Sequence, residues 1–229
     1  MVGAGAAGLA AAKQLREHGH AVRVFEMSND VGGVWQYEEK VEADLMGKEL
    51  DKRIHSSMYE SLRTNLPREV MAFDSLPFTD EYDARRFPHH SAVHKYLRKY
   101  AETHDLRTLI SFGRKVTNLE PLQQSASVDD STHTTVPAYH ESRGGEGAGD
   151  VRGFQGIAWA VEHSPISGGE VLREEFDVVM VCNGHYSEPW SPSFEGADTW
   201  TGRFSHSHNY RTPAPFTGDR LLVYCLHST

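Results

Sequence analysis

The chain has 229 residues, of which 38% are hydrophobic and 24% charged, and its formal net charge is −9. This composition is typical of a soluble globular protein, and no run reaches the roughly 18 consecutive apolar residues of a membrane span. The negative charge excludes the clustered basic surface that a nucleic-acid partner requires. Because no basic segment precedes an apolar one at the N-terminus, we expect no signal peptide and a cytoplasmic location.

The first elements in chain order alternate between helix and strand. Apolar residues recur at helical spacing in residues 6–18, which predicts a helix that ends at Gly19. The alternating, β-branched residues 21–25 predict a strand that ends at Glu26. A serine N-cap and a spaced apolar face predict a second amphipathic helix over residues 91–104. The pattern is that of an α/β fold.

The second half of the chain is predicted to be rich in strands. Residues 111–122 and 157–161 have strand-like patterns, and the Ser, Thr, Asp and Gly of residues 123–153 between them predict a disordered insertion. Residues 176–182 and 220–226 are continuous apolar runs, typical of strands buried on both faces of a parallel sheet.

A glycine fingerprint lies immediately ahead of the first helix. The pattern G-x-G-x-x-G is matched by Gly3, Ala4, Gly5, Ala6, Ala7 and Gly8. In this pattern the glycines form a tight turn, admit a pyrophosphate close to the backbone, and let the helix pack on a strand. A strand follows the helix and ends at Glu26, where a carboxylate can accept hydrogen bonds from ribose hydroxyls. Together these features predict a dinucleotide site.

The choice of dinucleotide depends on Glu26 and on the loop after it. A carboxylate at the ribose position repels the 2′-phosphate of NADP, so FAD and NAD remain. The glycine pair Gly32-Gly33, followed by Val34 and Trp35, is similar to the loop after the second strand in flavin-binding proteins of this fold. This similarity favours FAD, with Gly33, Val34 and Trp35 among its contacts.

The positions of the cysteines and histidines indicate whether the chain has a redox-active cysteine pair or a metal site. Cys182 and Cys225 lie far apart in apolar runs, so we expect two buried free thiols and no redox-active pair. This excludes a flavin disulfide reductase. The pairs His89-His90 and His206-Ser207-His208 lack the ligand spacing of a metal site, and no metal is expected.

Three stretches resemble the flavin-containing monooxygenases, and within them the plant S-oxygenase-like branch. Residues 59–71, which include LRTNLPREVM, and residues 181–189 are the most specific. The third is the family pattern F-x-G-x-x-x-H-x-x-x-Y, which corresponds to Trp200, Gly202, His206 and Tyr210, with tryptophan in place of the first phenylalanine. The final tyrosine differs from the tryptophan of the related Baeyer–Villiger monooxygenases.

The resemblance implies a two-cofactor reaction. NADPH reduces FAD, oxygen adds at the flavin C4a position, and one oxygen atom of the hydroperoxide passes to a soft sulfur or nitrogen nucleophile, a thioether or an amine. Asn65 would lie beside the flavin and the nicotinamide, as the residue nearest to catalysis, with Thr64 and Leu66 in cofactor contact. His206 either links two dinucleotide domains or satisfies local backbone groups. The plant branch suggests a thioether by analogy alone.

The expected architecture is α/β, a Rossmann-like FAD-binding domain over residues 1–190 with a small antiparallel β insertion. Residues 191–229 would form a linker and the start of a second, NADP-binding domain that is essentially missing. Only Met1-Val2 precede the fingerprint, where a strand of about 5 residues is usual, and no second G-x-G-x-x-G occurs. We therefore expect a chain truncated at both ends, and the alternative to an enzyme is a non-catalytic or vestigial FAD-binding fragment.

Overall fold

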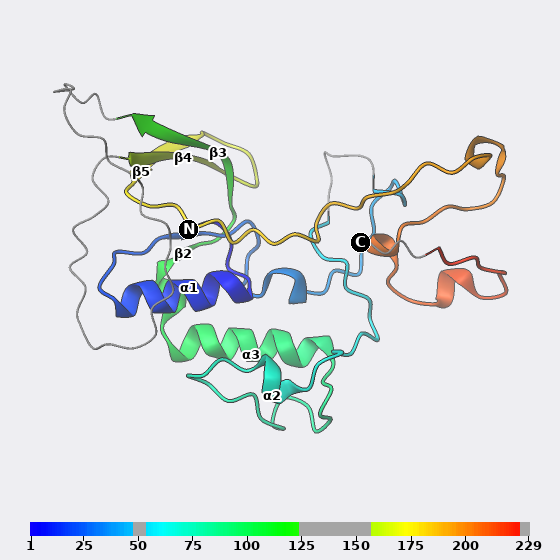
Figure 1. Cartoon of the computed structure of the whole chain (residues 1–229), viewed down its shortest axis with the longest axis horizontal. Coiled ribbons are helices and arrows are strands. Elements are labelled where there is room, and N and C mark those ends of the chain that lie inside the picture. The colour runs from blue at the N-terminus through cyan, green and yellow to red at the C-terminus, as the bar shows by residue number, and fades with distance from the viewer. Residues whose placement is uncertain (48–53, 124–156, 225–229) are drawn as a thin grey trace, which may run out of the picture. The chain divides into compact units, whose positions relative to one another are not determined.

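The computed structural model describes residues 1–47, 54–123 and 157–224. Two compact units divide the chain (Figure 1). The first combines Met1–Lys115 with Met180–Thr229, and the second is Val116–Val179. The expected domain boundary after residue 190 stays a prediction.

Helix α1 (Ala6–Glu17) follows the glycine-rich run directly. Gly19 lies just beyond it with φ 85°, a conformation that glycine adopts without strain, and it ends the helix as predicted. The strand predicted over residues 21–25 is shorter: β1 consists of Val24–Phe25. Its partner strand β2 (Ile110–Ser111) is equally short, so only these residues find a partner in the ladder.

Four short extended segments of the first unit form a parallel arrangement. Val24 pairs with Ile110, while Val2 forms parallel bridges with Phe25 on one side and Val181 on the other. In chain order of the segments, the spatial order is 3-2-1-4, which is the order of a Rossmann fold. The expected Rossmann-like topology is therefore present, although Val2 alone occupies the central position.

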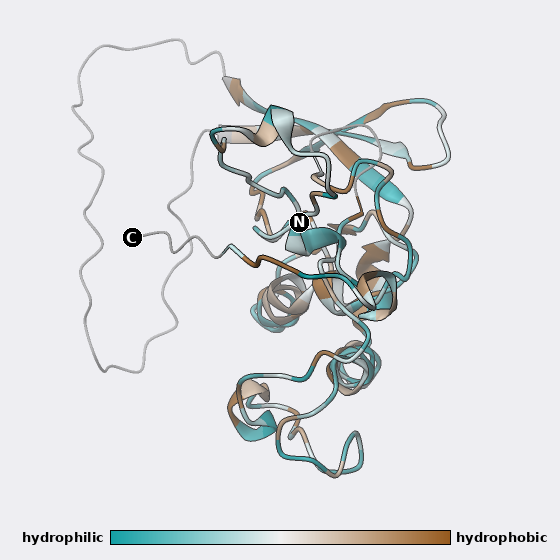
Figure 2. Ribbon diagram, turned by 90° about the vertical axis from the view of Figure 1, so that its right-hand side faces the viewer, coloured by the Kyte–Doolittle hydropathy of each residue, from teal (hydrophilic) through white to brown (hydrophobic). Residues whose placement is uncertain are grey.

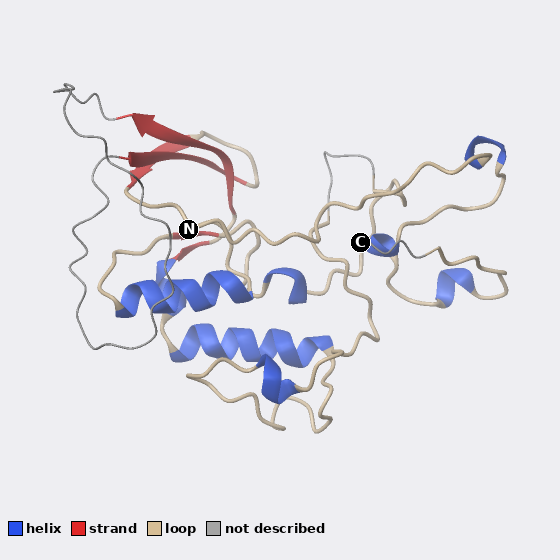
Figure 3. Cartoon of the chain, viewed as in Figure 1, coloured by secondary structure: helices blue, strands red, loops and turns tan. Residues whose placement is uncertain are grey.

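Helix α3 (His90–Thr103) confirms the second predicted helix, and it lies beside α1 (Figure 3). Its N-cap is His89 and not Ser91, because the His89 imidazole accepts the N–H of Ser91, which is already helical. The core of this unit gathers apolar residues from α1, β1, α3 and the start of η2 (Leu106–Leu109), and from the loops that hold Ala4, Val31 and Phe78. They are Ala4, Leu9, Ala12, Val24, Val31, Phe78, Ala92, Val93, Tyr96, Leu97, Tyr100, Ala101 and Leu106.

The second unit is a small sheet of three neighbouring strands. They are β3 (Arg114–Gln123), β4 (Ile157–Pro165) and β5 (Leu172–Phe176), in that spatial order. β4 and β5 are antiparallel, which confirms the expected antiparallel β insertion. The single strand predicted over residues 111–122 is divided by Gly113, whose φ of 64° turns the chain between β2 and β3. The predicted insertion 123–153 lies, apart from Gln123, outside the described residues.

The two apolar runs predicted to be buried strands are exposed instead. Val178 is 61% exposed and Val181 55%. Within the described residues, Phe176 at the start of the first run pairs with Trp159, and Val181 near its end pairs with Val2. Leu222 is 94% exposed, and residues 220–224 form no strand because no described segment pairs with them. Figure 2 shows the apolar middle of this stretch in brown, close to the grey terminal trace. Over the described residues, neither run is a strand covered on both faces, so both predictions were wrong there.

The remaining elements are short. They are η1 (Gly33–Trp35), α2 (Arg68–Met71), η2 (Leu106–Leu109), η3 (Ala197–Thr199), η4 (Ser207–Asn209) and η5 (Ala214–Phe216). Over the described ranges, none of the helices combines the length and the apolar character that a bilayer crossing requires.

Candidate cofactor site

The glycine-rich turn is built so tightly that two of its positions admit no side chain. Gly3 has φ 96°, and a Cβ there would lie 2.5 Å from the carbonyl oxygen of Cys182. A Cβ on Gly8 would lie 2.0 Å from the carbonyl oxygen of Gly3. Both distances are far shorter than any real contact, so glycine is required for the turn and for the close packing of α1. These are the structural roles expected for the first and third glycines of the fingerprint.

Gly5 is the N-cap of α1 and provides no capping side chain. The first intrahelical bond runs from the Leu9 N–H to the Gly5 carbonyl at 2.9 Å, so the N–H groups of the preceding turn have no partner within the helix. Ala7 is exposed and Ala6 half-buried at this end. Unpaired N–H groups and the positive end of the helix dipole suit a diphosphate.

Glu26 joins the end of β1 to the glycine-rich turn. Its side chain is 8% exposed; Oε2 accepts the Ala4 N–H at 2.6 Å and Oε1 accepts the Ser28 N–H at 2.7 Å. A carboxylate oxygen has two acceptor positions, so each oxygen keeps one for another donor. The carboxylate is thus fixed in place at the position where ribose hydroxyls are bound in this fold.

The loop Asp30–Trp35, here called the glycine-pair loop, lies against the fingerprint turn. The Gly32 N–H donates to the Ala4 carbonyl at 3.0 Å, and a Cβ on Gly33 would lie 3.1 Å from the Cα of Gly5. Gly33 has φ 55° and begins η1, in which Val34 and Trp35 are half-buried. The structure therefore brings Gly3–Gly8, Glu26 and the Gly33–Trp35 turn together. Where Gly33 lies against Gly5, backbone meets backbone without an intervening side chain.

Thr64, Asn65 and Leu66 form a separate turn. The buried Thr64 hydroxyl donates to the Leu66 carbonyl at 2.7 Å, and its N–H donates to the Pro88 carbonyl at 3.0 Å. This bonding presents the Asn65 side chain to solvent, and Leu66 is 50% exposed. Within the described residues no hydrogen bond connects this turn to the glycine-rich turn, so the cofactor roles of all three stay predictions.

His206 satisfies local backbone groups, one of its two expected roles. Its Nδ1 accepts the His208 N–H at 3.0 Å and thereby caps η4. With that nitrogen acting as acceptor, Nε2 carries the proton and donates to the Trp190 carbonyl at 3.2 Å. Both ring nitrogens are thus used by the backbone.

A buried polar cluster beside η4 has no counterpart in the sequence predictions. The Asn209 amide exchanges hydrogen bonds with Glu42, accepting its N–H at 3.0 Å and donating to Oε2 at 3.1 Å. Arg211, only 6% exposed, donates to the carbonyls of Ser56, His208 and Glu38. The one sequence feature that could have pointed to Arg211 is its position directly after Tyr210. No sequence feature points to Glu42.

Two further expectations can be compared with the structure. Cys182 is a free thiol but half-buried, and Val2 is the one described residue that pairs with Val181 beside it. Partial burial raises the pKa of the Cys182 thiol. Cys225 lies outside the described residues. In the part of the chain that the structure describes, no group of three or more His, Cys, Asp or Glu side chains could hold a metal ion.

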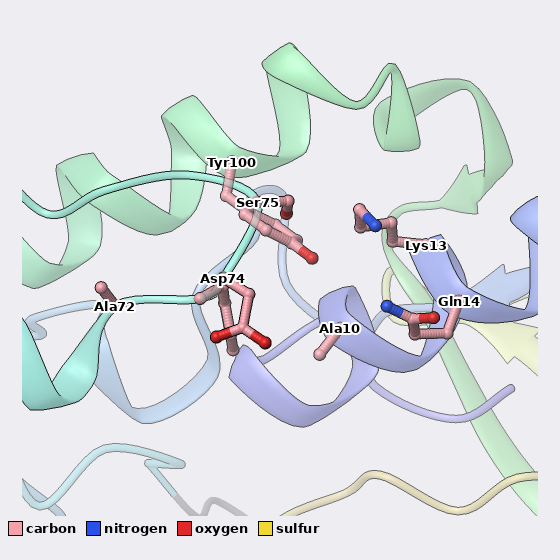
Figure 4. A pocket seen from close by; sticks show the side chains of 8 residues that line it. Ala10, Lys13, Gln14, Ala72, Asp74, Ser75 and Tyr100 are labelled. Carbon is pink, nitrogen blue, oxygen red and sulfur yellow. The ribbon is translucent and has the colours of Figure 1, made fainter. Parts of the chain in front are cut away.

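A cavity of about 230 Å³ lies between α1, residues 72–75 and α3. Figure 4 shows the side chains of Lys13, Asp74 and Tyr100 around it. None of the predicted cofactor residues is among those that line this cavity. The predicted cofactor residues therefore lie at the fingerprint turn and not in this pocket.

Parallel strand order, fingerprint turn and fixed carboxylate define a dinucleotide-binding protein of the Rossmann type. Comparison with known proteins specifies the family: a model described as flavin-binding monooxygenase-like matches residues 1–142 and 159–229. The chain belongs to this family of monooxygenases.

Relatives of known sequence and structure agree with this assignment. The chain is 38% identical to flavin-containing monooxygenase FMO GS-OX-like 2 of Arabidopsis thaliana, over 97% of this chain and 43% of the relative. It is 36% identical to the S-allyl-L-cysteine S-oxygenase of Allium sativum, with a TM-score of 0.76 over 94% of this chain and 42% of that one. Tmm from a Pelagibacter species shares the fold at 22% identity, with a TM-score of 0.65 over 94% of this chain and 42% of its own. The chain thus spans less than half the length of these relatives.

Proposed function

We propose that this chain provides the FAD-binding part of an NADPH-dependent monooxygenase that transfers one oxygen atom to the sulfur of a thioether or the nitrogen of an amine. The observation that carries the proposal is the fingerprint turn at the N-terminus of α1, with Glu26 bonded into it. The sulfur preference is supported by 36% identity to an S-oxygenase.

Different groups of residues would contact different parts of the cofactor. The N–H groups at the start of α1 would hold the diphosphate, and Glu26 would accept the ribose hydroxyls. Gly33, Val34 and Trp35 would lie along the cofactor, with Thr64, Asn65 and Leu66 nearer to its reacting ring. When bound, the flavin accepts a hydride from NADPH and activates O₂.

Asn65 would act by position. Its amide carries both donors and acceptors, and the Thr64 hydroxyl bond to the Leu66 carbonyl holds the turn that exposes it. An exposed amide at a fixed turn can orient a bound group without itself forming a covalent bond. No covalent nucleophile is needed for the proposed reaction, because the flavin provides the chemistry.

A second candidate function is FAD binding without turnover. The sequence holds a single G-x-G-x-x-G, and the chain spans 43% of its relative FMO GS-OX-like 2. One fingerprint supports one dinucleotide, FAD, so the site for NADPH and the site for the sulfur or nitrogen substrate are not supported by a motif in this chain.

Purification of the 229-residue chain separates the two candidates. Bound flavin absorbance together with NADPH consumption and sulfoxide formation from a thioether in air supports the monooxygenase. Flavin absorbance without NADPH consumption supports the binding module, and a colourless chain that takes up no added FAD refutes both.

A further inference from the structure

The glycine-pair loop is fixed at its start by a cluster of charged side chains around Asp30. Asp30 Oδ1 accepts a hydrogen bond from Arg107 Nη1 at 2.8 Å and another from the Val31 N–H at 2.9 Å. Its Oδ2 lies 3.3 Å from Arg98 Nε and 3.6 Å from His94 Nε2. Although partial burial opposes ionisation, the Arg107 hydrogen bond, the Val31 N–H and the nearby cations hold the pKa of Asp30 below its usual value.

These partners belong to other elements. His94 and Arg98 lie one turn apart on α3, and Arg107 belongs to η2. His94 also donates from Nε2 to the Val31 carbonyl at 2.9 Å, and a Cβ on Gly32 would lie 2.7 Å from its ring. The start of the glycine-pair loop therefore rests directly on α3, and His94 leaves no room for a side chain at Gly32.

The end of the loop has its own anchor. The Ser56 hydroxyl donates to the Val34 carbonyl at 2.8 Å. Ser56 is buried, with 4% of its surface exposed. Arg211 Nη2 donates to the Ser56 carbonyl at 2.9 Å, so the buried guanidinium holds Ser56 in place. The anchor thus reaches from the segment after the Trp200–Tyr210 pattern to the glycine-pair loop.

Between the two anchors, the loop faces the fingerprint turn. The Gly32 N–H bonds to Ala4, and Gly33 lies against Gly5, the N-cap of α1. A displacement of either anchor would move Gly33 relative to the helix end. A loop that is already ordered in the free protein binds its ligand more tightly, because less conformational entropy is lost on binding.

We propose that Asp30 and Ser56 are positioning residues for the flavin cofactor, which fix the glycine-pair loop against Gly5 without touching the cofactor themselves. The proposal rests on the proposed function, namely FAD binding at the fingerprint turn. Asp30 acts through Arg107 and α3, and Ser56 acts through the Val34 carbonyl.

FAD titration of the 229-residue chain and of the variants Asp30→Asn and Ser56→Ala tests the proposal. We expect the Kd for FAD to rise about tenfold or more in each variant. The matched control is Glu174→Gln in the second unit, which also weakens a carboxylate–histidine contact, at 2.7 Å from His163. Its Kd for FAD should stay within about twofold of the unaltered chain.

A spectroscopic readout separates positioning from general loss of structure. Trp35 lies in the glycine-pair loop and would quench flavin fluorescence, so at saturating FAD the bound flavin should be brighter in Asp30→Asn and Ser56→Ala than in Glu174→Gln. Far-UV circular dichroism checks that each variant folds. If Asp30→Asn does not fold, Ser56→Ala, which loses one hydroxyl, decides the outcome.

The outcomes are distinct. If the unaltered chain binds FAD and both folded variants bind it with the same Kd and the same fluorescence, the positioning role is overturned alone. If the unaltered chain binds no FAD, the proposed function is overturned and the positioning role with it.

Discussion

Glu26 and Ala4 are joined by a 2.6 Å hydrogen bond that links the end of β1 to the fingerprint turn. Loss of this carboxylate leaves the Ala4 and Ser28 N–H groups without their partner. We expect Glu26→Ala to lower the free energy of unfolding by about 1–3 kcal/mol, the usual cost of an unsatisfied buried polar group. Urea denaturation measures it. Glu26→Gln keeps one acceptor oxygen and should lose less, and equal losses in the two variants would contradict the role of the hydrogen bonds.

Gly3 and Gly19 provide a matched pair, because both have positive φ, 96° and 85°, but only Gly3 is enclosed. A Cβ on Gly19 meets no atom within 4 Å. We expect Gly19→Ala to cost about 1–2 kcal/mol for the left-handed conformation. Gly3→Ala should cost clearly more, because its Cβ would meet the Cys182 carbonyl oxygen at 2.5 Å. Thermal unfolding of both variants measures the difference, and similar melting temperatures would show that the turn can relax.

Tyr96 ties residues 73–76 to α3 through its hydroxyl. The oxygen accepts the Phe73 N–H at 2.7 Å, and the hydroxyl donates to the Leu76 carbonyl at 2.7 Å. We expect Tyr96→Phe to destabilise the chain by about 1–3 kcal/mol. Tyr100→Phe is the control, since the Tyr100 hydroxyl forms no hydrogen bond with the described residues, and it should change stability by less than about 0.5 kcal/mol. A Tyr96→Phe chain as stable as Tyr100→Phe would disprove the tie.

Asp83 makes stability depend on acid pH. Backbone N–H groups of His89 and Arg85, and then Arg63, lower the pKa of this carboxyl from 3.8 to about 2. Because the folded pKa is depressed, the stabilisation is complete above the unfolded value of 3.8 and is lost as the pH falls towards 2. Allowing for solvent screening, the loss should be on the order of 1 kcal/mol.

Denaturation curves collected between pH 5 and pH 2 test the Asp83 prediction. Asp83→Asn should be less stable at the upper end of this range and should lose less stability across it than the unaltered chain. If both proteins show the same slope against pH, other carboxylates account for the acid sensitivity.

Elements with local signals were predictable from sequence. The periodic apolar face and Gly19 are sufficient for α1, and the amphipathic pattern over residues 91–104 predicts α3 to within one residue at each end. The run 176–182 was mispredicted because burial of a strand depends on neighbours that are distant in sequence. Among the residues that the structure describes, Val181 pairs with Val2 alone, and the local sequence pattern holds no sign of that pairing.

The residues of the candidate site likewise include some that could be predicted from the sequence and some that could not. The glycines of the fingerprint and Glu26 were predictable, because their roles follow from fixed spacings in one βαβ unit. Asp30 and Ser56 were not, since their partners Arg107 and Arg211 lie 77 and 155 residues away. Only the folded chain brings such residues together.

The bridge between Val2 and Val181 also has a consequence for synthesis on the ribosome. Val181 is made 179 residues after Val2 (181 minus 2), while Phe25, the other partner of Val2, follows after only 23 (25 minus 2). The two partners of Val2 are 156 residues apart (181 minus 25), so at about 5–20 residues per second Val181 is made roughly 8–31 s after Phe25. During that interval the nascent fingerprint turn has one flank and lacks the Cys182 carbonyl that Gly3 packs against. The fingerprint turn therefore stays incomplete until Cys182 has been made.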